Sequence, residues 1–207
     1  MIQKKSLSII LLIFGLLVVA QVVVPIANYK IWEMTNFEKS FLVSPYPAGT
    51  SEILGVSVKN QDSFPAFVSD RKRLTPVPYS QFNMTIGRLG IKEAKVEVDN
   101  NDLDKGPSLL PGTALPGERG NVFISSHSSV LFNNNFSRLV NLKVGDNIEL
   151  MVGGTIFSYQ VVGIKVVDPH DLSVIEPPDS TGRYLSLMTC VPPGLNIKRL
   201  VVLAELI

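Results

Sequence analysis

The sequence has few of the side chains that most often carry out chemistry. Its 207 residues include one cysteine (Cys190), two histidines (His127 and His170) and one tryptophan. A single cysteine has no partner for a disulfide within the chain, so a disulfide-stabilised fold is excluded. Neither sign of charge is in excess, because 19 lysines and arginines stand against 18 aspartates and glutamates. The sequence has no run of lysines and arginines interleaved with aromatic residues, so nucleic acid is not an expected partner.

One long hydrophobic run is present near the N-terminus. Residues 6–27 carry no charge, and about 22 helical residues reach roughly 33 Å, enough to cross the hydrocarbon core of a bilayer. Lys4 and Lys5 precede the run, so the positive-inside rule keeps that end in the cytoplasm. We therefore expect a cytoplasmic tip and single-pass anchor over residues 1–27, with the rest of the chain outside the cytoplasm at the cell membrane.

A cleaved signal peptide is the alternative interpretation of this run. Val18, Val19 and Ala20 form a passable cleavage site, but apolar residues continue beyond it. The apolar region of a signal peptide is usually about 7–15 residues long, which favours an uncleaved anchor. Under either interpretation the functional part is extracytoplasmic.

The remaining chain divides into a proline-rich stretch and a β-rich domain. Residues 28–80 are predicted to be a stalk or appendage, in which residues 28–43 could continue the anchor helix and later prolines oppose long elements. Residues 81–207 alternate strand-like runs with turn residues, which predicts an all-β sandwich or barrel. A closed barrel is favoured because closure removes exposed edges. Short helices are expected around 107–110 and 136–141, and strands over 84–86, 95–98, 122–125, 147–152, 156–167, 184–190 and 199–206.

Local sequence places an arginine beside the single thiol. If residues 184–190 and 198–206 form a hairpin, Arg199 lies opposite Thr189 or Cys190, with side chains about 5 Å apart. His127 follows an earlier strand and must reach the thiol through tertiary structure. His170 lies in a turn-like segment and is expected to be structural or exposed to solvent.

These residues allow two interpretations when composition and spacing are taken alone. A nearby imidazole or guanidinium favours the thiolate that cysteine chemistry needs, and such a group can also stabilise an oxyanion. Yet a cysteine at a strand end is often a small buried apolar residue. A histidine among serines is often a surface residue, and an arginine starting a strand is often an edge charge.

Five segments of the last 120 or so residues stand out by their sequence and order. The segments are 84–91 (MTIGRLGI), 110–122 (LPGTALPGERGNV), 136–148 (FSRL followed by LKVGDNI), 185–190 (LSLMTC) and 198–202 (KRLVV). Together they resemble the sortase family of membrane-anchored cysteine transpeptidases, and the order His127, Cys190, Arg199 is also that of the family. Two small differences concern subclass: Ser126 stands where the family often has glycine before its histidine, and Ser186 replaces the first threonine of a Thr-Leu-x-Thr-Cys signature.

The resemblance implies an eight-stranded barrel over residues 81–207 and a mechanism. Cys190 would attack a sorting motif like Leu-Pro-x-Thr-Gly in a secreted protein, and His127 would act as acid and then base. Arg199 would hold the substrate carbonyl or the oxyanion. Further candidates for substrate contacts are Thr189, Val191 and Ser126. The acceptor would be an amine of a peptidoglycan precursor peptide or of a pilin lysine.

Alternatives from other classes stay open. The same barrel could be a catalytically inactive module that binds or anchors a partner, or a hydrolytic cysteine protease using water. The resemblance favours a class A, D or E sortase over a pilin sortase with a C-terminal anchor, because no second hydrophobic span follows. No cofactor is expected, and scattered carboxylates such as Glu93, Glu97 and Asp102 do not form a metal site.

Overall fold

The N-terminal unit of the protein is one long helix. The computed structural model describes residues 2–36, 56–61, 64–69, 76–128, 136–193 and 197–207. Helix α1 (Ile2–Asn36) contains a stretch, Ile9–Asn28, with a mean hydropathy of 3.0, long and apolar enough to cross a membrane. Described apolar side chains of this stretch, such as Leu12 and Phe14, are 64% and 65% exposed.

The predicted continuation of this helix beyond residue 27 is confirmed as far as Asn36, and residues 37–43 lie outside the described ranges. The chain divides into two compact units, Met1–Glu38 and Lys39–Ile207. The domain boundaries proposed from the sequence stay predictions.

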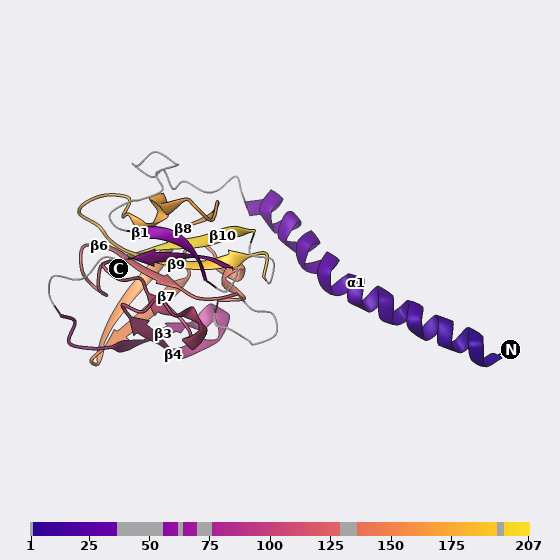
Figure 1. Ribbon diagram of the computed structural model, residues 1–207. Helices are drawn as coiled ribbons and strands as arrows, with labels where there is room; N and C mark the ends of the chain where they lie inside the picture. The colour runs from indigo at the N-terminus through magenta and orange to yellow at the C-terminus, as the bar shows by residue number, and fades with distance from the viewer. Residues whose placement is uncertain (1, 37–55, 62–63, 70–75, 129–135, 194–196) are drawn as a thin grey trace. The chain divides into compact units, whose positions relative to one another are not determined.

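Eight strands of the second unit close into a barrel (Figure 1), as the sequence predicts. Around the barrel their order is β10-β8-β7-β3-β4-β5-β6-β9, and β9 meets β10 to close it. Two neighbouring pairs, β4–β5 and β6–β9, are parallel, and the others are antiparallel. The bounds are β3 (Gln81–Ile86), β4 (Ile91–Val98), β5 (Ser108–Leu109), β6 (Gly120–Ser125), β7 (Asn147–Val152), β8 (Thr155–Val167), β9 (Arg183–Val191) and β10 (Lys198–Leu206).

Alternating apolar residues fill the barrel. In β3, Phe82, Met84 and Ile86 are 3%, 0% and 0% exposed, while the residues between them are partly exposed. Ile148 and Leu150 of β7 repeat the pattern at 0%. Burying each such side chain contributes about 1.5–3 kcal/mol, which is how a core without disulfides can hold this domain.

One predicted helix is wrong. Residues 107–110 were expected to be helical, but Ser108 and Leu109 form the two-residue strand β5. They pair with β4 on one side and with β6 on the other, so tertiary hydrogen bonds decide the conformation of a segment too short to be specified locally. The second expected helix, near 136–141, is present only as the short 3₁₀ helix η4 (Leu139–Asn141).

A β-hairpin from the appendage forms a separate two-stranded sheet, which the sequence did not predict. Strand β1 (Val56–Gln61) pairs with β2 (Phe64–Ser69), and Val58 lies opposite Phe67. Pro65 is inside β2, where the missing N–H is tolerated because each strand of this sheet is an edge. The proline in this region thus does not prevent a strand.

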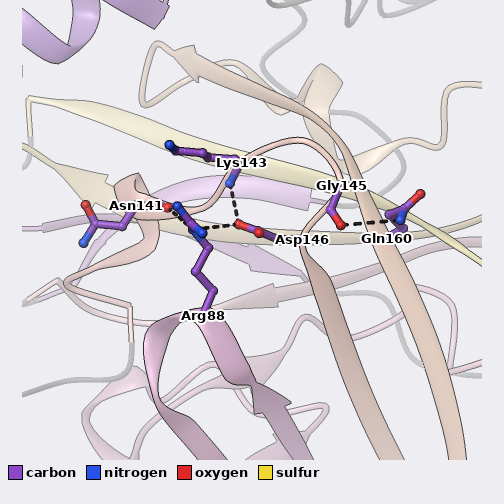
Figure 2. Close-up of polar contacts among 6 residues, drawn as sticks. All are labelled: Arg88, Asn141, Lys143, Gly145, Asp146 and Gln160. Atoms are coloured by element: carbon purple, nitrogen blue, oxygen red, sulfur yellow. Dashed lines mark hydrogen bonds and ion pairs between the residues drawn. The ribbon is translucent and has the colours of Figure 1, made fainter.

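A small polar network joins the turn after β3 to the segment before β7 (Figure 2). Arg88, in the 3₁₀ helix η2 (Gly87–Leu89), donates from Nε to the Asn141 carbonyl at 3.0 Å and lies 3.1 Å from Asp146 Oδ2. That carboxylate also accepts a hydrogen bond from the Lys143 N–H at 2.7 Å. These contacts fix the backbone of the segment that precedes β7.

Candidate active site

The hairpin of β9 and β10 places Cys190 opposite Arg199. This is one of the two registers expected from the sequence. Directly opposed residues point to the same side of a sheet, with side chains about 5 Å apart. Because side chains alternate along a strand, the next pair on this face is Met188 with Val201. The thiol and the guanidinium are therefore neighbours through local structure.

Both members of the pair are buried. Cys190 is 8% exposed and Arg199 is 1% exposed. Burial raises the pKa of the Cys190 thiol, and the positive charge of Arg199 partly offsets this by lowering it. Burial likewise lowers the pKa of the Arg199 guanidinium, against the raising effects of Cys190 and Asp168. Arg199 Nη1 donates to the Lys198 carbonyl at 3.1 Å, which fixes the direction of its side chain.

Parallel pairing of β6 with β9 brings His127 to the same end of the barrel. The last residue pair of this ladder is Ser125 with Met188. His127 follows Ser125 by two residues, and Cys190 follows Met188 by two, so both lie just beyond the same pair. His127 is half-buried there. The three predicted residues thus lie at or just beyond the same end of three adjacent strands, β6, β9 and β10.

The turn that carries His127 is attached to β9 by two hydrogen bonds. The Ser126 N–H donates to the Met188 carbonyl at 3.2 Å. The Thr189 hydroxyl donates to the Ser126 carbonyl at 2.9 Å. These contacts fix the backbone directly before His127, a role for Thr189 that sequence reasoning missed. The one feature of the sequence that could have indicated this role is the position of Thr189 directly before Cys190.

The additional candidates lie near the site but are buried. Thr189, Ser126 and Val191 are 2%, 5% and 1% exposed. Thr189 alternates with Cys190 and faces the opposite side of β9, and Val191 pairs with Lys198. Substrate contact by these residues stays a prediction. His170 is exposed in the turn after β8, as expected.

The connection from β8 to β9 forms a wall beside the strands. It contains the 3₁₀ helix η5 (Leu172–Ile175), whose first turn is capped by Asp171 through the Ser173 N–H at 3.1 Å. Asn121 of β6 donates from Nδ2 to the Ile175 carbonyl at 2.9 Å and holds the wall against the barrel. An open cavity of about 410 Å³ lies between this connection and the start of β6, and its lining includes Asn121 and Ile175.

A carboxylate network organises the end of this connection. Asp179 accepts hydrogen bonds from the Gly182 N–H at 2.7 Å, the Thr181 N–H at 2.8 Å and the Tyr184 hydroxyl. The Tyr184 bond is the largest cause that holds the pKa of Asp179 well below its usual value. The same bond raises the pKa of Tyr184 to about 12. Among the described residues, no cluster of three His, Cys, Asp or Glu side chains could hold a metal ion.

Comparisons with known proteins agree with this geometry. The family described as "Sortase domain" matches residues 77–207, well over half of the chain. Sortase A of Bacillus anthracis is 31% identical over 127 residues, 59% of this chain and 60% of that protein. Sortase D of Bacillus subtilis (strain 168) is 32% identical over 94 residues, 45% of each. The match thus spans less than two thirds of the length of these curated relatives.

Solved structures give the same result. Sortase A from Corynebacterium diphtheriae has a TM-score of 0.57 and 28% identity, covering 62% of this chain and 61% of that one. Streptococcus pneumoniae Sortase C has a TM-score of 0.57 and 30% identity, covering 62% and 70%. The neighbours include both A and C types, so the comparison leaves the subclass open. On the family match and the barrel together, the chain belongs to the sortase family.

Proposed function

We propose that this protein is a cysteine transpeptidase that cleaves a sorting motif in secreted proteins and transfers the acyl part to an amine. One observation carries the proposal. Cys190 and Arg199 are directly opposed on β9 and β10, and the turn bearing His127 is fastened to β9 beside them. A thiol, a fixed guanidinium and an imidazole at one strand end are the groups that acyl transfer through a thioester requires.

The first half of the reaction forms the thioester. The Cys190 thiol gives its proton to His127, and the thiolate Sγ attacks the scissile carbonyl carbon, whose oxygen takes the negative charge of the tetrahedral intermediate. The bond from carbon to the leaving nitrogen then breaks, and His127 as imidazolium gives that nitrogen a proton. A thioester on Cys190 and a free amine are the products of this half.

The second half releases the acyl group. An incoming amine attacks the thioester carbonyl, His127 accepts the proton that the amine loses, and the Cys190 sulfur leaves. Arg199 stabilises the oxyanion in both halves, because its guanidinium is held by the Lys198 carbonyl and buried where charge interactions are strong. The expected substrates are secreted proteins with a Leu-Pro-x-Thr-Gly-like motif. The acceptor is an amine of a peptidoglycan precursor or a pilin lysine.

Helix α1 supplies the proposed location. Its apolar stretch Ile9–Asn28 would anchor the protein in the cell membrane as a single pass, with Lys4 and Lys5 on the cytoplasmic side. The catalytic barrel would then lie outside the cytoplasm, where secreted proteins emerge.

The test is to trap the acyl-enzyme. The full chain in detergent is incubated with a panel of pentapeptides, and mass spectrometry measures the mass added to Cys190. The expected result is an adduct equal to the acyl part of one peptide, which an added amine converts to a peptide–amine product. Cys190→Ala should give no adduct, whereas His170→Ala, which changes an exposed histidine, should retain most activity.

Two results would contradict the proposal. If products with and without added amine are the same hydrolysed peptide, the protein is a hydrolase that uses the same residues. If no peptide of the panel modifies Cys190 and the thiol reacts slowly with alkylating agents, the barrel is a binding module. Equal loss of activity in Cys190→Ala and His170→Ala would also overturn the assigned roles.

A further inference from the structure

Lys198 forms an ion pair with Asp168 directly beside the proposed catalytic arginine. Lys198 Nζ lies 2.7 Å from Asp168 Oδ2, and the two side chains are 38% and 62% exposed. Asp168 is the first residue after β8, and Lys198 is the first residue of β10. Because an ion pair this exposed contributes little to stability, its position next to Arg199 indicates another role.

Arg199 lies between two groups that can carry a negative charge. Its opposed residue on β9 is Cys190, and its opposed residue on β8 is Val167, which Asp168 follows in the chain. Burial lowers the pKa of Arg199, whereas the Cys190 thiol and then the Asp168 carboxylate raise it. A guanidinium can bind a carboxylate through two parallel hydrogen bonds. Asp168 is therefore a competitor for the group that a thiolate at Cys190 needs.

Lys198 holds Asp168 on the other side of β10. Side chains alternate along a strand, so Lys198 and Arg199 point to opposite sides. The hydrogen bond from Lys198 is the largest cause that lowers the pKa of Asp168, and the charges of His170 and then Arg199 contribute less. The main partner of Asp168 is thus the lysine and not the arginine. The Lys198 carbonyl also accepts the hydrogen bond from Arg199 Nη1 at 3.1 Å, so one residue contacts both members of the competing pair.

We propose that Lys198 is a positioning residue for the proposed reaction, because it occupies the Asp168 carboxylate and so prevents Asp168 from binding Arg199. While Lys198 holds Asp168, the guanidinium stays directed toward Cys190. Without Lys198, Asp168 forms an ion pair with Arg199 instead, which reduces the positive charge that acts on Cys190. The inference rests on the proposed function for its effect on catalysis, but its effect on the thiol requires no substrate.

Two simpler roles for this ion pair predict different results. If the pair only fastens β10 to the end of β8, removing either member should have the same effect as removing both. If the two charges act on Cys190 only through space, Lys198→Gln should have the same effect whether or not Asp168 is charged. Competition for Arg199 predicts that Lys198→Gln matters only while Asp168 carries its charge. A double-mutant cycle measures this dependence of one substitution on the other.

The first experiment measures the thiol without any substrate. Cys190 is the single cysteine, so iodoacetamide reports on it alone. Full chains in detergent carry Lys198→Gln, Asp168→Asn, both substitutions or Lys198→Arg, and thermal unfolding checks that each variant is folded. Lys105→Gln is the matched control, because Lys105 forms an ion pair with Asp102 at 3.4 Å in the connection from β4 to β5. The readout is the pH midpoint of alkylation.

Lys198→Gln should raise this midpoint by about one pH unit, about tenfold in rate at neutral pH, because Asp168 then draws Arg199 away from the thiol. Asp168→Asn alone should not raise it, and the double variant should have the same midpoint as Asp168→Asn. Lys198→Arg, which keeps a cation for Asp168, and Lys105→Gln should stay near the wild-type midpoint. Equal shifts for Lys198→Gln in both backgrounds, or no shift in either, would overturn the inference.

The second experiment measures the effect on catalysis, with a peptide that acylates Cys190. Lys198→Gln should lower kcat about tenfold with little change in KM, because Arg199 acts on the oxyanion of the transition state. Adding Asp168→Asn should restore most of kcat, a recovery that a merely structural ion pair would not show. A loss of kcat that Asp168→Asn does not restore would contradict the competition.

The role of Lys198 and the proposed function can fail separately. A shift of the alkylation midpoint that depends on Asp168, without any peptide adduct on Cys190, would refute the transpeptidase and keep the role of Lys198. Peptide transfer that is as fast in Lys198→Gln as in the wild type would refute the role of Lys198 and keep the transpeptidase.

Discussion

The Thr189 hydroxyl donates a hydrogen bond to the Ser126 carbonyl at 2.9 Å, in a buried position and across 63 residues of sequence. This contact joins the strand that carries Cys190 to the turn that carries His127. It lies on the side of β9 opposite to Cys190, so we expect the hydroxyl to act through the position of the His127 turn.

Thr189→Val should therefore lower activity while leaving the reactive groups present. Loss of the donor leaves the buried Ser126 carbonyl without this bond, which costs about 1–3 kcal/mol of unfolding free energy. A displaced His127 should reduce kcat by about ten- to a hundredfold with little change in KM. Urea unfolding and steady-state kinetics measure the two effects.

The matched control for this change is Thr189→Ser, which keeps the hydroxyl and removes only a methyl group. It should restore most of kcat. Equal kcat values for the valine and serine variants would show that the hydrogen bond does not position His127.

The reactivity of Cys190 should depend on pH in a direction set by its surroundings. Burial raises the pKa of the thiol and Arg199 lowers it, with burial the larger effect. Alkylation by iodoacetamide should therefore increase with pH about a midpoint above the value for an ordinary thiol, about 8.5. Arg199→Gln should move the midpoint further upward, and Arg199→Lys, which keeps a positive charge, should move it less. A midpoint below that of an ordinary thiol would contradict this account.

Asp179 should contribute to stability in a manner that depends on pH. Its pKa is held well below the ordinary value, chiefly by the Tyr184 hydroxyl and next by the Gly182 N–H. A lowered carboxyl pKa stabilises the folded state above the unfolded pKa, about 3.9, and this contribution is lost as the pH falls. The Tm of Asp179→Asn should be lower than that of the wild type near pH 6. The difference should shrink below about pH 4.

The same substitution should be visible at Tyr184. The hydrogen bond to Asp179 is the largest cause that raises the pKa of Tyr184 to about 12. Removing the carboxylate should bring that pKa back toward about 10, which an ultraviolet titration of the phenolate follows. No change in the titration would show that the hydrogen bond is not formed in solution.

Two glycines with similar backbone angles should respond differently to alanine. Gly117 has φ +83°, and a Cβ there would lie 2.3 Å from the Phe157 ring, whereas Gly154 has φ +86° with nothing within 4 Å. Gly154→Ala should lower the free energy of unfolding by about 1–2 kcal/mol, because alanine is strained in the left-handed conformation. Gly117→Ala should lower the free energy of unfolding by clearly more, because the Phe157 ring must also move. Chemical denaturation compares them, and equal losses would contradict the close contact.

The hairpin of β9 and β10 could be predicted because its two strands are neighbours in the sequence. Turn residues between two strand-like runs predicted that β9 and β10 pair, and Arg199 could then lie only near Thr189 or Cys190. The strand β7 was also predicted with its observed bounds, 147–152. Alternation of apolar residues is a local property, so it identifies such strands without knowledge of their partners.

Other features depend on contacts that local sequence does not encode. Ser108 and Leu109 became strand β5 because β4 and β6 lie on either side of them. His127 reaches Cys190 through the parallel pairing of β6 with β9, and parallel strands cannot be joined by a tight turn. The appendage hairpin was missed because its prolines oppose long elements, while the burial of Phe67 depends on an apolar surface formed by distant strands.

The sequence by itself determined the long apolar helix, the β-rich domain, the single thiol and the arginine beside it, because each follows from composition or from residues close together in the chain. Only the tertiary structure decided three other features: the exact register of Arg199 with Cys190, the Thr189 bond that fastens the turn of His127, and the burial of Phe67 against distant strands. These depend on which distant strands pair, and pairing is settled by the closure of the whole barrel.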